Sequence, residues 1–246
     1  MRRVTITFTI LLAVGAPLRA QEWIEYQNNE DGFKVNFPGP PKITESWWST
    51  EQGYILPERV YSAEMGGGKY SMTVVDYNAI DRLGMDRSEK CPVGAETCQG
   101  QPAGELRNII GPGYGVQDIR DALVYASFKY ISRPGVTVTD YLWNFEDLVE
   151  GHQLNLTNPD GSRSFVAIYM LRNKLYILDG TVPKGYPEPG LLQQSLGFVD
   201  KDGAGIRFHE VYSNEFHGLG LLPEPARFNI PDFGYAAPAQ PESNAR

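Results

Sequence analysis

The sequence predicts an α+β fold, in which an antiparallel β-sheet is flanked by helices within one large domain. Several segments alternate apolar and polar residues with the period of two that is typical of half-buried strands, and glycine or proline turns separate them. One segment, 118–132, instead has apolar residues at helical spacing. The core material is ample, because 41% of residues are hydrophobic and 12% are aromatic.

Residues 1–20 have the three-part pattern of a bacterial-type secretory signal peptide. Arg2 and Arg3 precede an apolar run over 4–14, and the segment ends in Ala20. The run is too short for a bilayer, which needs about 20 residues, and no cysteine follows it to accept a lipid. We therefore expect cleavage after Ala20 and a periplasmic or secreted protein, with an uncleaved membrane anchor as the alternative.

The charge of the chain disfavours two classes of partner. Cleavage would remove three of the 22 basic residues and none of the 30 acidic ones, which leaves a net charge of −11. An acidic surface of this size repels phosphate backbones and anionic lipids. We expect no nucleic-acid binding and no peripheral membrane binding.

A first β block covers residues 22–77. The expected strands are 23–26, 33–37, 54–64 and 69–77. Prolines within 38–41 end the second strand, because proline cannot donate to a sheet. Three glycines at 66–68 provide the backbone freedom of a hairpin turn between the last two strands.

Residues 81–116 lose this periodicity, and we expect a long exposed insertion there. Cys91 and Cys98 lie within it, and their spacing in an exported chain predicts a disulfide that closes a short loop. The pair lacks the CxxC spacing of common metal and redox sites. An ordered loop of this length is often functional, and a simple spacer is the alternative. The domain itself is expected over 21–222, followed by a flexible tail at 223–246 rich in proline and alanine.

The second half predicts one long helix and then an antiparallel meander. Asp118 is the expected N-cap of helix 118–132, and Pro134 with Gly135 ends it. The expected later elements are strands at 141–145, 151–156, 164–171 and 174–182, a short helix at 190–198, and a strand at 206–212. Arg172 and Asn173 form the expected two-residue hairpin connection.

Two stretches together resemble the Mog1/PsbP-like family. They are DGFKVNFPGPP at 31–41, and SRSFVAIYMLRNKLYILDGTVPKG at 162–185 leading into LLQQSLGFVD at 191–200. The resemblance covers roughly 22–77 and 117–200 and implies an α-β-α sandwich. It also implies an accessory or binding protein and not an enzyme. The photosynthetic members dock on photosystem II and help to retain its inorganic ions, but no position here matches a family binding site, so that partnership is not carried over.

No catalytic constellation is evident in the sequence. Ser195 is followed by the second glycine of a nucleophile elbow, but the first glycine is missing and the segment is expected to be helical. The three histidines, His152, His209 and His217, lack the spacing of a zinc site. No cofactor is expected.

The densest acidic run on the meander consists of Asp140, Glu146, Asp147 and Glu150. Carboxylates of this kind can hold a hard cation such as calcium, or can act in acid–base chemistry. The spacing of an EF-hand is absent, and acids are also expected on a solvated strand. The run is the candidate metal site, with a solvated strand face as the alternative.

Trp47 and Trp48 are the candidate partner-binding residues. Adjacent strand residues point to opposite faces, so both tryptophans are buried only if both faces are covered. An exposed tryptophan is typical of a partner interface. Tyr54 and Tyr114 are the expected neighbours in such a contact.

The leading functional hypothesis is an exported, non-enzymatic accessory or binding protein that recognises an envelope protein or a small ligand. One alternative is a metal-assisted hydrolase that uses the acidic run with a histidine, such as Asp140 with His152. The other is a calcium-stabilised structural module.

Overall fold

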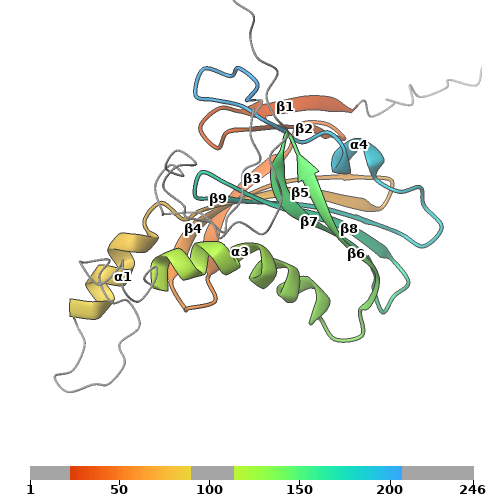
Figure 1. Ribbon diagram of the computed structural model, residues 1–246. Helices are drawn as coiled ribbons and strands as arrows, with labels where there is room; N and C mark the ends of the chain where they lie inside the picture. Colours follow the sequence, from red (N-terminus) through yellow and green to blue (C-terminus); the bar gives the residue numbers. More distant parts are fainter. Residues whose placement is uncertain (1–22, 90–113, 207–246) are drawn as a thin grey trace, which may run out of the picture.

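The protein is described by a computed structural model over residues 23–89 and 114–206. Its main element is a seven-stranded antiparallel sheet with the strand order β3-β4-β5-β9-β8-β7-β6 (Figure 1). The strands are β3 (Lys42–Ser49), β4 (Ile55–Met65), β5 (Gly68–Asp76), β6 (Thr137–Glu146), β7 (Val149–Thr157), β8 (Arg163–Leu171) and β9 (Lys174–Val182). Strands β3 and β6 therefore form the two edges.

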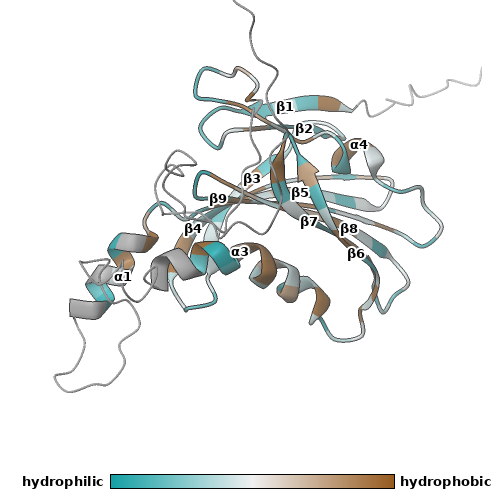
Figure 2. Ribbon diagram, viewed as in Figure 1, coloured by the Kyte–Doolittle hydropathy of each residue, from teal (hydrophilic) through white to brown (hydrophobic). Residues whose placement is uncertain are grey.

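Helices cover one face of this sheet. The long helix α3 (Tyr114–Ile131) packs against β7 and β8, and α1 (Ile80–Glu89) packs against α3. Ile119, Leu123 and Ala126 of α3 join a cluster with Val166 and Ile168 of β8. Figure 2 shows hydrophobic residues along α3 and along the strands that it faces.

A second, smaller sheet covers the other face. It consists of β1 (Ile24–Asn28), β2 (Phe33–Phe37) and β10 (Gly197–Phe198), in the order β1-β2-β10, and the short helix α4 (Gly190–Gln193) lies beside it. Phe33, Val35 and Phe37 are fully buried in a core shared with Tyr61 and Tyr169 of the large sheet. The antiparallel sheet of the predicted fold is present, but its two long helices flank only one face. The other face is covered mainly by the small sheet, with the short helix α4 packed against β8 and β9, because the alternating β1 and β2 sequences form a sheet with an apolar inner surface.

Three hairpins turn through two residues with positive φ. Gly66 and Gly67 connect β4 to β5, and Arg172 and Asn173 connect β8 to β9, as the sequence predicts. The β6–β7 turn, like the β8–β9 turn, contains no glycine, and Asp147 and Leu148 adopt φ values of 48° and 66° there. A branched side chain in this left-handed region raises the backbone energy.

Several predicted boundaries are wrong. Residues 80–89 form α1, although the irregular composition after residue 81 predicts a loop; α1 is held instead by its packing on α3. Helix α3 begins at Tyr114, so Asp118 is inside it and is no N-cap. The Asp118 carboxylate accepts hydrogen bonds from the Thr50 hydroxyl and the Gln52 backbone N–H, which fastens α3 to the loop after β3.

The end of the described chain also differs from the prediction. The helix expected over 190–198 stops at Gln193, and β10 then pairs with β2. Several predictions concern residues that the structure does not describe. They are the signal peptide at 1–20, the pair Cys91 and Cys98, most of the strand expected at 206–212 and the tail at 223–246. Within the described residues, no helix is long and apolar enough to cross a membrane.

Candidate functional site

Trp47 and Trp48 lie on opposite faces of the edge strand β3. Trp48 is 7% exposed and packs under α3, where its indole N–H donates to the Tyr77 hydroxyl at 3.1 Å and the Lys129 ammonium lies 3.8 Å from its ring centroid. Trp47 is 72% exposed, because the small sheet ends before it reaches this part of the opposite face. Of these two tryptophans, only Trp47 is available to a partner.

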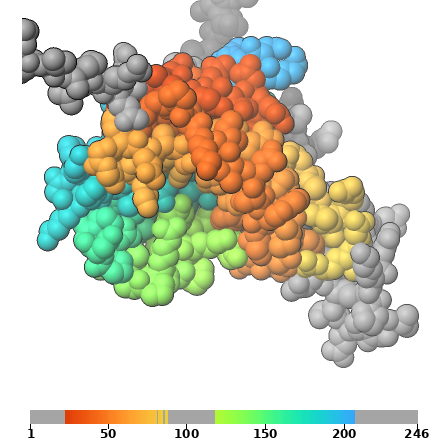
Figure 3. Space-filling model, turned by 180° about the vertical axis from the view of Figure 1, so that it is seen from behind, coloured from red at the N-terminus to blue at the C-terminus, as the bar shows by residue number. Residues whose placement is uncertain are grey.

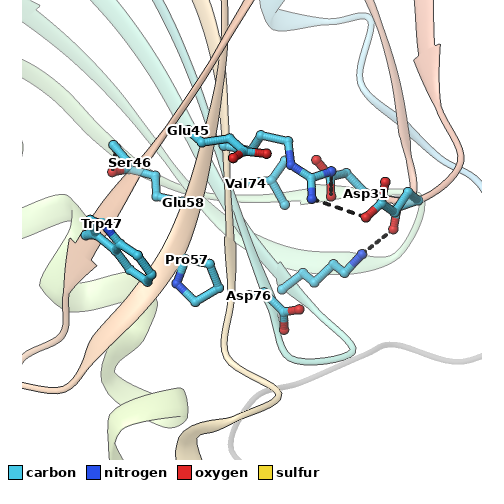
Figure 4. A pocket seen from close by; sticks show the side chains of 11 residues that line it. Asp31, Glu45, Ser46, Trp47, Pro57, Glu58, Val74 and Asp76 are labelled. Carbon is cyan, nitrogen blue, oxygen red and sulfur yellow. Dashed lines mark hydrogen bonds and ion pairs between the residues drawn. The ribbon is translucent and has the colours of Figure 1, made fainter.

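Trp47 lines a groove of about 500 Å³ on the strand side of the molecule (Figure 4). Pro57 pairs with Trp47 across β3 and β4, and the two rings form an apolar surface at one end of the groove. The remaining lining residues are Glu30, Asp31, Glu45, Ser46, Glu58, Arg59, Val74, Asp76 and Lys174. Seen from behind, β3 and β4 form the outer surface between the β1–β2 hairpin and α3 (Figure 3).

The turn between β1 and β2 forms the opposite wall of the groove. Asp31 is 5% exposed, and its carboxylate accepts hydrogen bonds from the Arg59 guanidinium at 3.0 Å and from the Tyr61 hydroxyl at 2.5 Å. Glu30 accepts from the same guanidinium at 3.2 Å. Its backbone carbonyl accepts from the Lys174 ammonium. These contacts hold the turn against the large sheet.

The electrostatics of the groove are dominated by acids. Burial lowers the pKa of Arg59, but its hydrogen bonds to Glu30 and Tyr61 and the charge of Asp31 outweigh burial and raise that pKa, so this cation is permanent. Burial, and then the hydrogen bond to Asp31, raise the pKa of the Tyr61 hydroxyl. Four carboxylates, those of Glu30, Asp31, Glu45 and Asp76, and the two cations Arg59 and Lys174 lie on the groove side, so the charge of the groove is negative; the Glu58 carboxylate lies with Ser46 on the helical face. An aromatic platform beside negative charge suits a cationic or cation-bearing aromatic group.

The other candidate partner-binding residues do not join this surface. Tyr54 is 3% exposed and its ring lies 3.8 Å below the Arg87 guanidinium, close to α1. Tyr114 begins α3, on the helical side of the sheet. Neither Tyr54 nor Trp48 has the exposure that a contact residue needs, because α1 and α3 cover this face.

The acidic run does not converge on one point. The β6–β7 register places Glu150 opposite Phe145, on the face toward α3, whereas Asp140 lies opposite Asn155 on the other face and accepts a hydrogen bond from its amide. Glu146 and Asp147 lie at the turn between the strands. No group of three His, Cys, Asp or Glu residues in the described ranges could hold a metal ion. The structure therefore does not bring Asp140, Glu146, Asp147 and Glu150 together as one group.

Glu146 nevertheless has an unusual environment. It is half-buried, and burial together with the nearby negative charge of Asp147 raises its pKa to about 7. This carboxyl group changes its charge near neutral pH.

His152 and Ser127 form a hydrogen-bonded pair that looks like part of a catalytic site but is buried. The Ser127 hydroxyl lies 2.8 Å from His152 Nδ1, and each residue is 1% exposed. The ring of Trp143 covers the imidazole, with centroids 4.7 Å apart. In the β6–β7 register His152 lies opposite Trp143, on the face toward α3, whereas Asp140 lies opposite Asn155, on the other face. The Asp140 and His152 side chains therefore point to opposite sides of the sheet. The hydrolase hypothesis that joins Asp140 to His152 therefore lacks its geometry.

A second groove of about 470 Å³ lies on the helical face, beside the C-terminal end of α3. It is lined by Lys42, Ser62, Ala63, Glu64, Lys69, Tyr70, Ser71, Asp179 and Thr181. The Asp179 carboxylate accepts hydrogen bonds from the Thr181 hydroxyl at 2.9 Å and from the Tyr130 hydroxyl of α3, and burial raises the pKa of Asp179. The Thr181 hydroxyl also contacts the Ser164 hydroxyl, so the polar groups at this end of the sheet are satisfied by one another and by α3.

The edge strand β6 is the feature that the sequence analysis did not single out. Tyr141, Trp143 and Phe145 are each about half exposed on its helical face, and Leu142 is 53% exposed on the other. The alternation of aromatic residues predicts a strand correctly, but it does not show that the strand is at an edge. The position in the sheet depends on pairing between distant segments, which the pattern leaves open.

Comparison with known proteins gives a distant likeness in structure. No family model matches the chain, and no curated protein matches its sequence. The solution structure of cyanobacterial PsbP (CyanoP) from Synechocystis sp. PCC 6803 is similar with a TM-score of 0.38 at 10% identity, over 76% of this chain and 98% of that chain. A likeness at this level carries no inference about partner or activity.

Proposed function

We propose that this chain is an exported, non-enzymatic binding protein that holds a basic segment of an envelope protein in the groove beside Trp47. The exposure of Trp47 carries the proposal: a side chain of this size, 72% exposed beside Pro57, gives an apolar contact that only a partner covers. The carboxylates along the groove would select a cationic partner.

Export is supported by the pattern of residues 1–20, and a binding role by the absence of accessible catalytic groups in the described parts of the chain. The one serine–histidine pair described above is closed to substrate by Trp143 and α3. An arginine or lysine of a partner would stack on Trp47 and face Glu45 or Asp76 across the groove.

The binding test uses the chain over 21–246. Fluorescence anisotropy of dye-labelled lysine- and arginine-rich peptides is followed while the protein is added, so the signal does not depend on Trp47. We expect saturable binding that weakens with salt, and a loss of about tenfold in affinity with Trp47→Ala. Glu150→Gln, on the far side of the sheet, is the matched control and should leave the affinity unchanged.

Equal binding by the Trp47→Ala variant would refute the groove as the site. Export has its own test, because fractionation of cells that express the full chain should give a periplasmic or released protein shortened by residues 1–20. Retention of the full-length chain in the cytoplasm would refute the exported role.

A further inference from the structure

The second exposed apolar region is what we call the β6 surface. It consists of large hydrophobic side chains on β6, on the β6–β7 turn and on the outer side of α3, each 41–59% exposed: Val124, Phe128, Val138, Tyr141, Leu142, Trp143, Phe145 and Leu148. Ser127 of α3 contacts His152, which lies beneath Trp143, so α3 runs beside this part of the strand. Val124 and Phe128 lie on the side of α3 that faces away from the sheet, because Ile119, Leu123 and Ala126 occupy the buried side, and they extend the apolar surface over the helix.

Within residues 23–89 and 114–206, the backbone of β6 has no strand partner on its outer side. Strand β6 is the last in the order of the large sheet and pairs only with β7 among the described strands. It is ten residues long and contains no lysine or proline, the residues that commonly protect an edge strand. An edge of this kind binds another extended strand through backbone hydrogen bonds.

We propose that the β6 surface binds a second copy of this chain, with the two β6 strands paired antiparallel about a two-fold axis through Leu142. Antiparallel edge pairing is self-complementary, so one surface serves both copies. The axis is perpendicular to the sheet and places both α3 helices on the same face of the joined sheet. Val124 and Phe128 of the two copies then lie on the same side as the paired aromatic residues.

The charges on β6 favour this register. Pairing about Leu142 sets Tyr141 opposite Trp143 of the other copy, and Asp140 opposite Asn144. Pairing about Trp143 would instead set Asp140 opposite Glu146, and like charges directly opposite are destabilising. The absence of an acid–acid pair therefore distinguishes the proposed register from pairing about Trp143.

The area of the surface suits a weak dimer. An aromatic side chain covers about 150–250 Å² when it is fully buried, so Tyr141, Trp143 and Phe145, each about half exposed, offer on the order of 300 Å² per copy before the aliphatic side chains and the strand backbone are added. A stable interface buries about 800 Å² per partner, so we expect a dimer that forms in the micromolar range. The β3 edge offers less, because Ile43 and Trp47 are its only strongly exposed large hydrophobic residues within the described chain.

The test measures the mass of the chain over 21–246 by sedimentation equilibrium, from low to high micromolar concentration. We expect a dimer, and a weakening of about 30-fold or more with Trp143→Lys. Ile43→Lys on the opposite edge is the matched control and should dimerise normally. Thermal unfolding of each variant verifies that it is folded.

A crosslink tests the register independently. Leu142 of each copy would lie opposite its counterpart, within the Cα separation that a disulfide bridges, so Leu142→Cys should give a covalent dimer on oxidation, whereas Ile43→Cys should not. Monomers at all concentrations, loss of the dimer with Ile43→Lys, or no crosslink with Leu142→Cys would each overturn the proposal. A monomer would assign the edge to another occupant, either a different protein or residues 207–246 of this chain.

Discussion

The two edges of the large sheet each present an exposed tryptophan, but their surroundings differ. At β3, Trp47 stands beside one proline in a groove of carboxylates, fixed by the Asp31–Arg59 contacts. At β6, Trp143 lies among other exposed apolar side chains on both faces of the strand and on α3. The first setting suits a charged, dissimilar partner, and the second suits an apolar and self-complementary one.

The difference shows that an exposed aromatic residue by itself does not identify a partner. Trp47 and Trp143 occupy the same kind of position, at the outermost strand of one sheet. What differs is whether the next elements contribute charge or apolar surface. The β1–β2 turn supplies acids to the β3 edge, whereas α3 supplies Val124 and Phe128 to the β6 edge.

The largest expected effect separates the two tryptophans of β3. Trp48→Ala should lower the free energy of unfolding by about 4 kcal/mol, because it leaves a cavity under α3 and removes the partner of the Tyr77 hydroxyl. Trp47→Ala should change it by less than about 0.5 kcal/mol. Urea unfolding measures both, and similar losses would show that Trp47 belongs to the core and not to a binding surface.

The turn that forms the wall of the Trp47 groove should be the next most sensitive point. Asp31→Ala removes a buried carboxylate, leaves the Tyr61 hydroxyl without its acceptor and leaves Arg59 with Glu30 alone, so we expect a loss of about 3 kcal/mol in urea unfolding. Glu30→Ala is the control, because Glu30 binds the same guanidinium from a side chain that is 77% exposed, and it should lose under about 0.5 kcal/mol. A small effect of Asp31→Ala would mean that the turn is held by the apolar side chains of β2 alone.

Local pattern accounts for most of the strands in this molecule. The period of two and the turn residues predict β2 and β9 at their observed bounds, and they predict the hairpin through Arg172 and Asn173. Adjacent strand positions also predict that Trp47 and Trp48 face opposite sides. These features depend on residues that are close in the sequence.

The Trp47 groove is built from residues that are distant in the sequence, so the sequence predicts it less well than the strands. Asp31 and Arg59 come from separate hairpins, and nothing in either segment shows that they meet. Asp140 and His152 are near each other in the sequence, but the bulge and register of β6 and β7 place them on opposite faces. Similarly, the start of α3 was misplaced because Asp118 resembles an N-cap, although its partners Thr50 and Gln52 lie in another loop.

The free energy of unfolding should vary with pH because of Glu146, at the end of β6. The pKa of Glu146 is raised to about 7 in the folded chain, so the folded state keeps a proton that the unfolded state releases above about pH 4.5. Stability should therefore fall as the pH rises from about 4.5 to 7, by on the order of 1 kcal/mol after allowance for the partial exposure of this group. Glu146→Gln should remove this part of the fall between pH 5 and 8 in urea unfolding, and Glu150→Gln should keep it. An unchanged pH profile in Glu146→Gln would contradict the raised pKa.

The smallest expected effect concerns the strained turn at the end of β6. Leu148 has a φ of 66° and is 43% exposed, so its side chain raises the backbone energy and gains little from burial. Leu148→Gly should raise the free energy of unfolding by about 0.5 kcal/mol, since the strain relieved exceeds the added freedom of the unfolded chain. Asn173→Gly, at a φ of 64° in the β8–β9 turn, is the control and should gain less, because asparagine tolerates this region. If the β6 surface binds a second copy, Leu148→Gly should stabilise the monomer and weaken the dimer in the same preparation. A gain in monomer stability with unchanged dimerisation would remove Leu148 from the contact and restrict the β6 surface to the strand and α3.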